Sequence, residues 1–428
     1  MLTKEENRLI TLTGPDTPGG ALMRCYWHPI ALADELPPGG APMPIKILGE
    51  DLVLFRDDRD RPGLLGLYCS HRCADLSYGR VEDGGLRCLY HGWLYDIDGH
   101  CLEQPAEPPE SQYKNEIRHL AYPVTERAGL IFAYMGKGEP PLLPSYECFG
   151  APPQHRCLQK IFMECNYLQA LEGDIDPAHL SYLHRSWRRR PSWRKGAVPG
   201  SDKSAGVLHT ESRQPRLESE RTDFGVRNYA IRDTGDGARY VRINNFIMPN
   251  KVGSIGNEGR IGEGYTIHWH VPVDDENHVR FDIFFNRVRP IPRQRYEQEL
   301  ATEVIDNRYR RNKRNRYLQD REEMKTANFS GMGDSNALQD AFATETPGPI
   351  HDRSREHLGT TDTHIVAARR QLLAGVAAVQ AGRDPIHVVR DPAQDDMSHI
   401  VVVSEVIPAD VDHKKLWKRR MQKPQAAG

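Results

Sequence analysis

Short apolar runs broken by turn residues fill the first third of the chain. The stretch from Pro44 to Phe55 predicts two strands that turn at Gly49–Asp51, and Leu64–Tyr68 predicts a further strand. Strands of this length in close succession are typical of a small antiparallel domain. The Pro-rich stretch at residues 138–144 predicts a boundary, so we expect a first, all-β domain with an N-terminal extension over residues 1–145.

A second pattern of apolar positions follows over residues 146–428. β-rich runs, among them Tyr240–Ile247 and Tyr265–Val271, predict another antiparallel sheet. Two stretches with helical periodicity, near Tyr296–Met324 and Thr363–Ala381, are expected to pack on this sheet. The chain is therefore predicted to be an α+β protein with two domains.

Composition limits the cellular compartment and the partners that we expect for this chain. The 428 residues of the chain carry a formal net charge of −2, which gives no general attraction to nucleic acid or to acidic membranes. Eight cysteines do not make a disulfide framework in a chain of this length, so a reducing compartment is expected. No apolar run approaches the ~20 residues of a membrane span, and Met1–Asn7 is too charged for a secretory signal. We expect a cytoplasmic protein with no membrane or nucleic-acid partner.

Two short clusters in the first domain each combine a thiol with an imidazole: Cys69 with His71, and Cys88 with His91. A Rieske [2Fe-2S] cluster needs two thiolates on one iron and two imidazoles on the other, so each loop must supply one of each. A zinc site is the alternative, but zinc-finger spacings usually pair Cys with Cys and His with His. This C-x-H and C-x-x-H pattern resembles that of Rieske proteins. Cys73 lacks the second-loop cysteine with which respiratory Rieske proteins form a disulfide, so we expect a free, packed thiol; oxygenase-type relatives commonly have Gly near this position.

A second set of possible metal ligands follows in the other domain. Glu172, Asp176 and His179 are spaced at i, i+4 and i+7, which predicts that they share one face of a helix. His184 comes five residues after His179, so the helix must be widened or broken for both imidazoles to meet. Two imidazoles and one carboxylate are the ligands of non-haem iron(II) oxygenases, and Asp340 is the candidate carboxylate. Ordinary polar surface residues remain the alternative.

Together these features resemble a known family, the terminal oxygenase components of Rieske non-haem iron aromatic-ring oxygenases, and within it the phthalate 4,5-dioxygenase branch. The stretches that carry the resemblance are Thr13–Gly20, Cys88–Trp93, Leu171–His184 and Asp352–Gly359. The resemblance implies a catalytic domain of the helix-grip type, with an antiparallel sheet flanked by helices.

The resemblance also implies roles for individual residues. Cys69, His71, Cys88 and His91 would hold the [2Fe-2S] cluster, and His179, His184 and Asp340 would hold a mononuclear Fe(II). Asp176 would carry electrons between subunits by bridging a cluster histidine of one subunit to an iron-ligating histidine of its neighbour, and Asn166 would lie near the iron. Electron transfer between subunits implies a closed homo-oligomer, a trimer or a hexamer.

The implied substrate is an aromatic carboxylic acid, oxidised with O2. Arg242 matches a family arginine that pairs with the substrate carboxylate, and Arg227 is a second candidate, because a guanidinium suits bidentate recognition. The chain has no Gly-x-Gly-x-x-Gly fingerprint, so a separate reductase with flavin and an iron–sulfur centre must bring electrons from NADH or NADPH. Ring dihydroxylation and monooxygenation that ends in O-demethylation both remain open. The long segment at residues 186–222 leaves room for a bulky, lignin-derived acid beside a phthalate-like one.

Three further points stay open at this level. The basic run at residues 185–195 is interpreted as a solvated loop, with an entrance loop for anions or a nucleic-acid patch as alternatives. A basic helix face at residues 308–316 is expected to face solvent or to dock an acidic reductase. The rival to an oxygenase is a Rieske electron-transfer protein with a non-catalytic binding domain, which would hold two irons per chain and not three.

Overall fold

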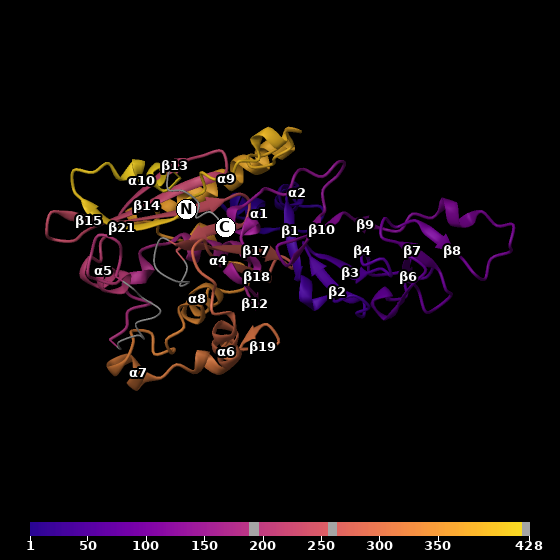
Figure 1. Ribbon diagram of the computed structural model, residues 1–428, viewed down its shortest axis with the longest axis horizontal. Coiled ribbons are helices and arrows are strands. Elements are labelled where there is room, and N and C mark those ends of the chain that lie inside the picture. The colour runs from indigo at the N-terminus through magenta and orange to yellow at the C-terminus, as the bar shows by residue number, and fades with distance from the viewer. Residues whose placement is uncertain (188–196, 256–262, 422–428) are drawn as a thin grey trace.

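The computed structural model of the chain describes residues 1–187, 197–255 and 263–421, so most of the basic run at 185–195 lies outside the described residues. The molecule is elongated, with a small β domain at one end and a larger α+β domain at the other (Figure 1). None of the helices in the described ranges combines the length and the apolar character that crossing a membrane requires.

The β domain is built from three small antiparallel sheets. One sheet contains β2 (Met43–Ile47), β3 (Glu50–Arg56), β4 (Pro62–Gly66) and β9 (Ala121–Tyr122). The second contains β5 (Arg80–Glu82), β6 (Gly85–Arg87), β7 (Leu94–Asp96) and β8 (Cys101–Glu103). The third contains β1 (Trp27–Leu32), β10 (Val124–Arg127) and β11 (Leu130–Tyr134).

The predicted hairpin is confirmed as β2–β3, but its turn comes earlier than expected. Ile47 pairs with Glu50, which leaves Leu48 and Gly49 as the two turn residues. Both have left-handed backbone conformations, with φ of 51° and 82°. This geometry follows the right-handed twist of the flanking strands, and glycine adopts it without strain.

An eight-stranded antiparallel sheet forms the centre of the larger domain. Its strands are, in spatial order, β12 (Arg156–Met163), β18 (His278–Asn286), β17 (Gly264–Pro272), β16 (Lys251–Ser254), β15 (Ala238–Ile247), β14 (Gly225–Asp233) and β13 (Arg216–Arg221), with β21 (Val403–Pro408) paired to β15. β15 and β17 correspond to the two strands predicted from the sequence.

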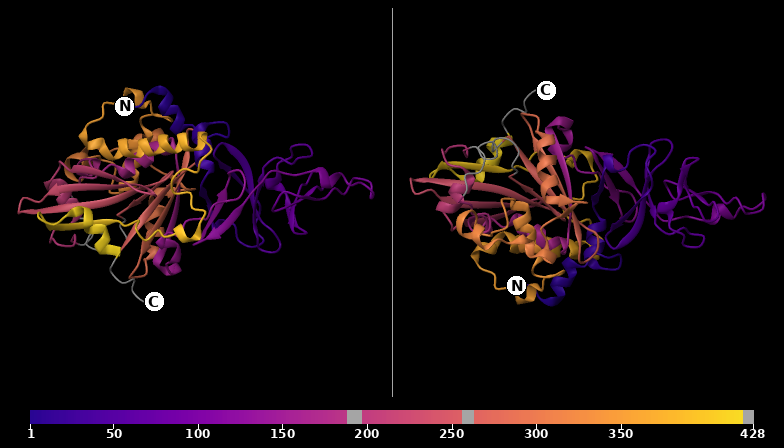
Figure 2. Two further views of the ribbon diagram at one scale, coloured as in Figure 1. Left: turned by 90° about the horizontal axis from the view of Figure 1, so that it is seen from above. Right: turned by 90° about the horizontal axis from the view of Figure 1, so that it is seen from below.

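Helices cover this sheet. The α-helices are α1 (Lys4–Thr11), α2 (Pro18–Arg24), α3 (Glu147–Gly150), α4 (Tyr167–Ile175), α5 (Ala205–Glu211), α6 (Arg293–Glu303), α7 (Arg321–Thr326), α8 (Asn336–Glu345), α9 (Thr363–Gln380) and α10 (Leu416–Met421). The predicted helix near 363–381 is confirmed as α9, which runs along the sheet in Figure 2. The α+β architecture, with an all-β domain and a second antiparallel sheet flanked by helices, is confirmed.

The predicted helical stretch near 296–324 is α-helical only at its two ends, in α6 and α7, and the prediction is wrong for the residues between them. α6 ends at Glu303 and is followed by a hairpin of β19 (Val304–Ile305) and β20 (Arg308–Tyr309). Asp306 and Asn307 form its turn with φ of 49° and 58°, a conformation that Asn and Asp tolerate better than other residues with side chains. The basic segment 308–316 is therefore not a helix face, because it begins in this hairpin and ends in the 3₁₀ turn Lys313–Leu318.

The N-terminal extension packs on the larger domain. Ile10 of α1 and Leu22 of α2 belong to the same buried core as Leu171 of α4 and Leu372 of α9. Apolar burial of this kind contributes ~25 cal/mol per Å², so the first two helices help hold α4 in place. The domain boundary at residue 145 stays a prediction.

Candidate metal centres and substrate site

The two cysteine–histidine clusters, Cys69 with His71 and Cys88 with His91, lie in similar turns of the β domain. The carbonyl of Cys69 accepts from Cys73 N at 2.8 Å, and that of Cys88 accepts from Gly92 N at 3.0 Å. Gly92 has a φ of 77°, which a residue with a side chain rarely adopts. Each loop is thus folded around its cysteine, and the two loops present one thiol and one imidazole each.

The four side chains suit a two-iron cluster. The thiols of Cys69 and Cys88 are buried, and the rings of His71 and His91 lie 4.4 Å apart between centroids. His91 Nδ1 is buried and has no hydrogen-bond partner in the described part of the chain, as expected of a metal-binding nitrogen. No three of these four described residues lie close enough together to ligate a single ion, which disfavours zinc.

Aromatic and polar neighbours hold these ligands, and the sequence analysis assigned them no role. The ring of Trp93 stacks on His71 with centroids 4.5 Å apart. Tyr95 Oη lies 3.2 Å from Cys69 Sγ, and burial, the largest effect, raises the pKa of this thiol. His119 bonds both Ser70 Oγ, at 2.7 Å, and the carbonyl of Gly66, at 2.8 Å, which fixes the first loop.

Cys73 departs from expectation. Its thiol forms no disulfide, but the side chain is exposed and not packed. The residue has a φ of 57°, in the region that favours glycine. The backbone conformation therefore accounts for the glycine that oxygenase-type relatives commonly have near this position.

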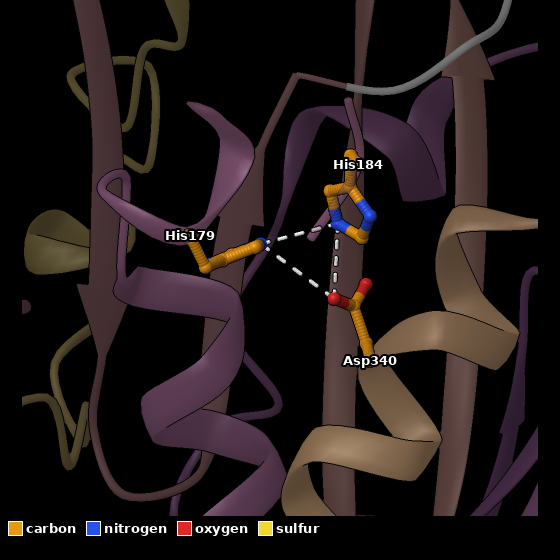
Figure 3. Close-up of side chains that lie close together, drawn as sticks. All are labelled: His179, His184 and Asp340. Atoms are coloured by element: carbon orange, nitrogen blue, oxygen red, sulfur yellow. Dashed lines mark hydrogen bonds and ion pairs between the residues drawn. The ribbon is translucent and has the colours of Figure 1, made fainter. Parts of the chain in front are cut away.

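The second metal-ligand set converges from two distant segments, as Figure 3 shows. His179 Nε2 lies 3.2 Å from His184 Nε2 and 3.5 Å from Asp340 Oδ1, and His184 Nε2 lies 3.0 Å from the same oxygen. These three donors are mutually close enough to bind one metal ion. Two imidazoles and one carboxylate leave coordination positions open, as non-haem iron(II) oxygenases require.

Local structure explains how both imidazoles reach this point. α4 ends at Ile175, Pro177 cannot continue it, and His179 begins the 3₁₀ turn His179–Ser181. The expected break in the helix is therefore present. Asp340 comes from α8, which packs beside α4.

The outer nitrogens of both imidazoles have partners. His184 Nδ1 lies 2.7 Å from Gln339 Oε1, and Gln339 Nε2 donates to the carbonyl of Gly333 at 2.8 Å. His179 Nδ1 lies 3.5 Å from Asp176 Oδ2. Such partners orient metal-binding imidazoles. The sequence analysis missed Gln339, although its place next to Asp340 offered a signal.

The charges at this site favour a cation. Burial alone would lower the pKa of His179, but the hydrogen bond to Asp176 and the charge of Asp340 raise it overall. Burial likewise raises the pKa of Asp176, whereas His179 and two backbone N–H groups lower it overall. The Asp176 carboxylate therefore stays ionised and stabilises positive charge on His179.

Two residues singled out in the sequence do not lie at this site. Glu172 is buried in a separate ion-pair network with Arg353 and Arg369, at 2.9 and 2.6 Å. Asn166 caps the start of α4, and its Nδ2 donates to the carbonyls of Thr11 and Asp275. The expectation that Asn166 lies near the iron is therefore wrong, because it stands at the opposite end of α4 from the triad.

The two candidate arginines lie on opposite faces of the sheet. Arg242 pairs across from Ala230, so it shares a face with Arg232, two residues further along β14. Arg232 Nη2 donates at 2.7 Å to the carbonyl of Pro177, next to Asp176, which places this face toward the iron triad. Arg227 is an odd number of residues from Arg232 and points to the other side.

The contacts of Arg227, Arg232 and Arg242 are consistent with these positions on the two faces of the sheet. Arg227 lies over the ring of Trp417 at 3.9 Å and donates to the carbonyl of His399 at 2.9 Å. Arg232 and Arg242 have no carboxylate partner among the described residues, whereas Arg227 Nη1 lies 3.5 Å from Glu220 Oε2; each of the three arginines has one buried N–H group without a partner there. Burial, followed by repulsion from Arg242, lowers the pKa of Arg232 to about 10. Two uncompensated guanidiniums near a metal site form a wall suited to an anion.

The fold and the two ligand sets define a class of protein: an oxygenase subunit that joins a Rieske cluster domain to a mononuclear iron domain. Residues 26–121 match the family model described as Rieske [2Fe-2S] domain, and residues 133–427 match the one described as LigXa C-terminal domain like. The chain belongs to the Rieske non-haem iron aromatic-ring oxygenases, as a terminal oxygenase component of the phthalate 4,5-dioxygenase-like branch. It is an enzyme, with a Rieske [2Fe-2S] cluster and mononuclear iron as cofactors.

Individual relatives agree with this placement. The chain is 37% identical to the phthalate 4,5-dioxygenase oxygenase subunit of Pseudomonas putida, over 90% of this chain and 89% of that protein. It is 32% identical to the 5,5'-dehydrodivanillate O-demethylase oxygenase subunit of Sphingobium sp. (strain NBRC 103272 / SYK-6), over 97% and 88%. A solved reduced complex between oxygenase and ferredoxin in carbazole 1,9a-dioxygenase shares the fold, with a TM-score of 0.55, 20% identity and coverage of 92% and 97%.

Proposed function

We propose that this chain is the terminal oxygenase subunit that uses O2 and externally supplied electrons to oxidise an aromatic carboxylic acid. The observation that carries the proposal is the closeness of His179, His184 and Asp340 on the side of the sheet where Arg232 and Arg242 have no carboxylate partner in the described part of the chain. A metal site beside an anion-binding wall can hold an aromatic acid with its ring toward the metal.

Each centre has its own residues. His179, His184 and Asp340 hold the mononuclear iron, which supplies O2 activation when bound. Cys69 and Cys88 hold one iron of the cluster, and His71 and His91 hold the other. Gln339 keeps the His184 ring in the orientation that directs Nε2 at the metal.

Arg242 and Arg232 bind the substrate carboxylate and turn the ring toward the iron. A carboxylate between them would restore hydrogen bonds to their buried N–H groups and neutralise their charge. Both named relatives act on aromatic acids, phthalate in one and 5,5'-dehydrodivanillate in the other. Arg227 takes no part, because it lies on the far face of the sheet.

Electrons enter from a separate partner and cross between subunits. The sheet β5–β8, next to the cluster loops, lies at the far end of the molecule from α4 and α8 (Figure 1), so we infer that the cluster of one subunit serves the iron of a neighbour. Asp176, already 3.5 Å from His179, is the bridge on the receiving side. This arrangement requires a closed homo-oligomer, a trimer or a hexamer. The donor is an NAD(P)H-dependent flavin and iron–sulfur reductase in the cytoplasm; the related carbazole oxygenase forms a complex with a ferredoxin.

The test combines metal analysis with product analysis. Three irons per chain support an oxygenase, whereas two support the alternative, an electron carrier with a non-catalytic binding domain. The anaerobically reduced protein is then given a surrogate reductase, O2 and a panel of aromatic acids. Products that gain two oxygens and two hydrogens identify ring dihydroxylation, and formaldehyde with loss of a methylene unit identifies O-demethylation. Absence of O2 uptake with every acid would refute the proposed substrate class.

A further inference from the structure

A row of charged and imidazole side chains lies beneath the end of α4. β17 and β18 pair so that His268 is opposite Asp282 and His270 is opposite Arg280. Residues paired in this way share one face of the sheet. Asp174 of α4 reaches the same face, with its Oδ2 2.8 Å from His270 Nε2. The side chain of His270 is fully buried, and that of Asp174 is 13% exposed.

The hydrogen bonds place one extra proton in this row. His278 Nδ1 lies 2.8 Å from the carbonyl oxygen of Cys165, which can only accept, so this nitrogen carries a hydrogen. Burial holds the pKa of His278 well below its ordinary value, so the ring is neutral and its Nε2 accepts. His270 Nδ1, 3.1 Å away, therefore donates to it. The other nitrogen of His270, Nε2, faces the Asp174 carboxylate. A hydrogen bond between these two groups needs a proton in addition to the one on His270 Nδ1.

Burial disfavours protonation of His270 Nε2, whereas the Asp174 carboxylate favours it. Burial is the largest influence on His270 and leaves its pKa lowered overall, although the hydrogen bond to Asp174 and the charge of Asp174 act in the opposite direction. Without the proton, a lone pair of His270 Nε2 and one of Asp174 Oδ2 would face each other at 2.8 Å in a largely buried site, which is costly. The proton therefore belongs to the hydrogen bond between the two groups. The other titratable or charged groups that face the pair are His268 of β17, His278, Arg280 and Asp282 of β18, Tyr309 of β20 and Asp340 of α8.

The row lies within electrostatic range of the iron-site residues. Asp174 stands in the last turn of α4, two residues before Asp176. Its charge contributes to the raised pKa of His179, after burial, which lowers that pKa, and after Asp176 and Asp340. The pKa of Arg280, on the same face as His270, likewise responds to Asp340. Asp174 is thus the member of the buried row whose charge acts on His179 of the iron site.

We propose that Asp174 and His270 share one proton in the resting protein and donate it to the oxygen-reducing site during turnover, a role that rests on the proposed function. Either oxidation of the acid consumes one O2, two electrons and two protons. Dihydroxylation leaves both oxygen atoms in the product, and monooxygenation releases one as water. The electrons come from the iron and the reduced cluster. The pair supplies one of the two protons and is reprotonated from solvent at the partly exposed Asp174.

The first experiment measures the shared proton without turnover. The full chain is labelled with ¹⁵N-histidine, and zinc replaces the mononuclear iron. His270 is assigned from the signals that disappear in His270→Gln. We expect both of its nitrogens to be protonated or in a strong hydrogen bond from pH 6 to 8, and a neutral ring in Asp174→Asn. A neutral wild-type His270 with one bare nitrogen would overturn the proposal.

The second experiment measures proton delivery in the holoenzyme. A single turnover of the reduced protein with O2 and an accepted acid is expected to be about 100-fold slower in Asp174→Asn, the scale of a lost general acid. Asp174→Glu is expected to recover most of the rate. Asp282→Asn, which removes another buried carboxylate bound to an imidazole on the same face, is the matched control and keeps the wild-type rate. Iron content and the cluster spectrum are checked in each variant.

The outcomes separate the two proposals. An Asp174→Asn variant that keeps its iron and reacts as fast as wild type overturns proton delivery. If Asp174→Asn loses iron, His270→Gln is used in its place. The same slow turnover is expected of His270→Gln, and an unchanged rate would overturn the proposal. A wild-type protein that oxidises no aromatic acid refutes the proposed function, and proton delivery with it, while the zinc-protein spectra still decide whether the proton is shared.

Discussion

Replacement of Arg242 by methionine should change stability and acid binding in opposite directions. Methionine keeps much of the length and apolar surface of the side chain, but it removes a partly buried charge that no described carboxylate neutralises. The pKa of Arg232 falls to about 10 through burial first and repulsion by Arg242 second. A fall from 12.5 to about 10 corresponds to roughly 3 kcal/mol. Because repulsion by Arg242 is the second cause after burial, Arg242→Met should relieve only part of this cost and raise the free energy of unfolding, on the order of 1 kcal/mol.

The same substitution should weaken binding of the acid. A charge-assisted hydrogen bond contributes about 1.5–3 kcal/mol, which corresponds to roughly a 10- to 100-fold increase in Kd. Binding is measured by titration of the oxidised holoenzyme, and stability by urea unfolding of the same preparation without acid. The KM should rise with the Kd, while the iron content stays that of the wild type.

Arg227→Met is the matched control on the opposite face of the sheet. It loses the stacking on Trp417 and the hydrogen bond to the carbonyl of His399, so its free energy of unfolding should fall by about 1–2 kcal/mol. Its Kd for the acid should equal that of the wild type. An Arg242→Met protein that is less stable and binds the acid normally would refute the reasoning, as would an Arg227→Met protein with a raised Kd.

Three further substitutions test other parts of the structure. Gln339→Leu leaves Nδ1 of His184 without its acceptor, so iron retention against a chelator should fall roughly 10- to 100-fold. Gln339→Glu should restore iron retention. Retention equal to that of the wild type in Gln339→Leu would contradict the assignment. Cys73→Gly relieves a left-handed backbone and should raise stability by about 1 kcal/mol without altering the cluster spectrum, which a lowered Tm would contradict. Burial holds the pKa of Lys251 well below its ordinary value, so the unfolded chain binds more protons there below pH ~10 and wild-type stability should rise from pH 7 to 9. Lys251→Met should lessen that rise, and an equal slope in both proteins would rule the effect out.

Much of the site was predictable because its signals are local. Cys69 and His71, like Cys88 and His91, are separated by one or two residues, so each pair shares one turn wherever the rest of the chain goes. The end of α4 before His179 also follows from helix geometry and Pro177. Strand and helix positions could be predicted where a regular apolar pattern persists, as in β15, β17 and α9.

The predictions failed where a contact with another residue or a local backbone conformation determined the structure. The helical pattern over 296–324 is interrupted because Asp306 and Asn307 turn the chain back on itself. Glu172 has the spacing of a ligand, but two arginines from distant segments bind it instead. Asn166 is polar and buried because it caps α4, a role that sequence spacing alone does not distinguish from metal support.

The sequence by itself determined the chemistry of this protein: two thiols, four imidazoles and a carboxylate in patterns that suit a two-iron cluster and a single iron. Tertiary structure alone decided which distant groups join them. Gln339 reaches His184 across 155 residues of chain, and the register of β14 with β15 places Arg242 beside Arg232 and away from Arg227. The physical reason is that side chains alternate along each strand, so the face of a residue relative to another strand is set only when the two strands pair.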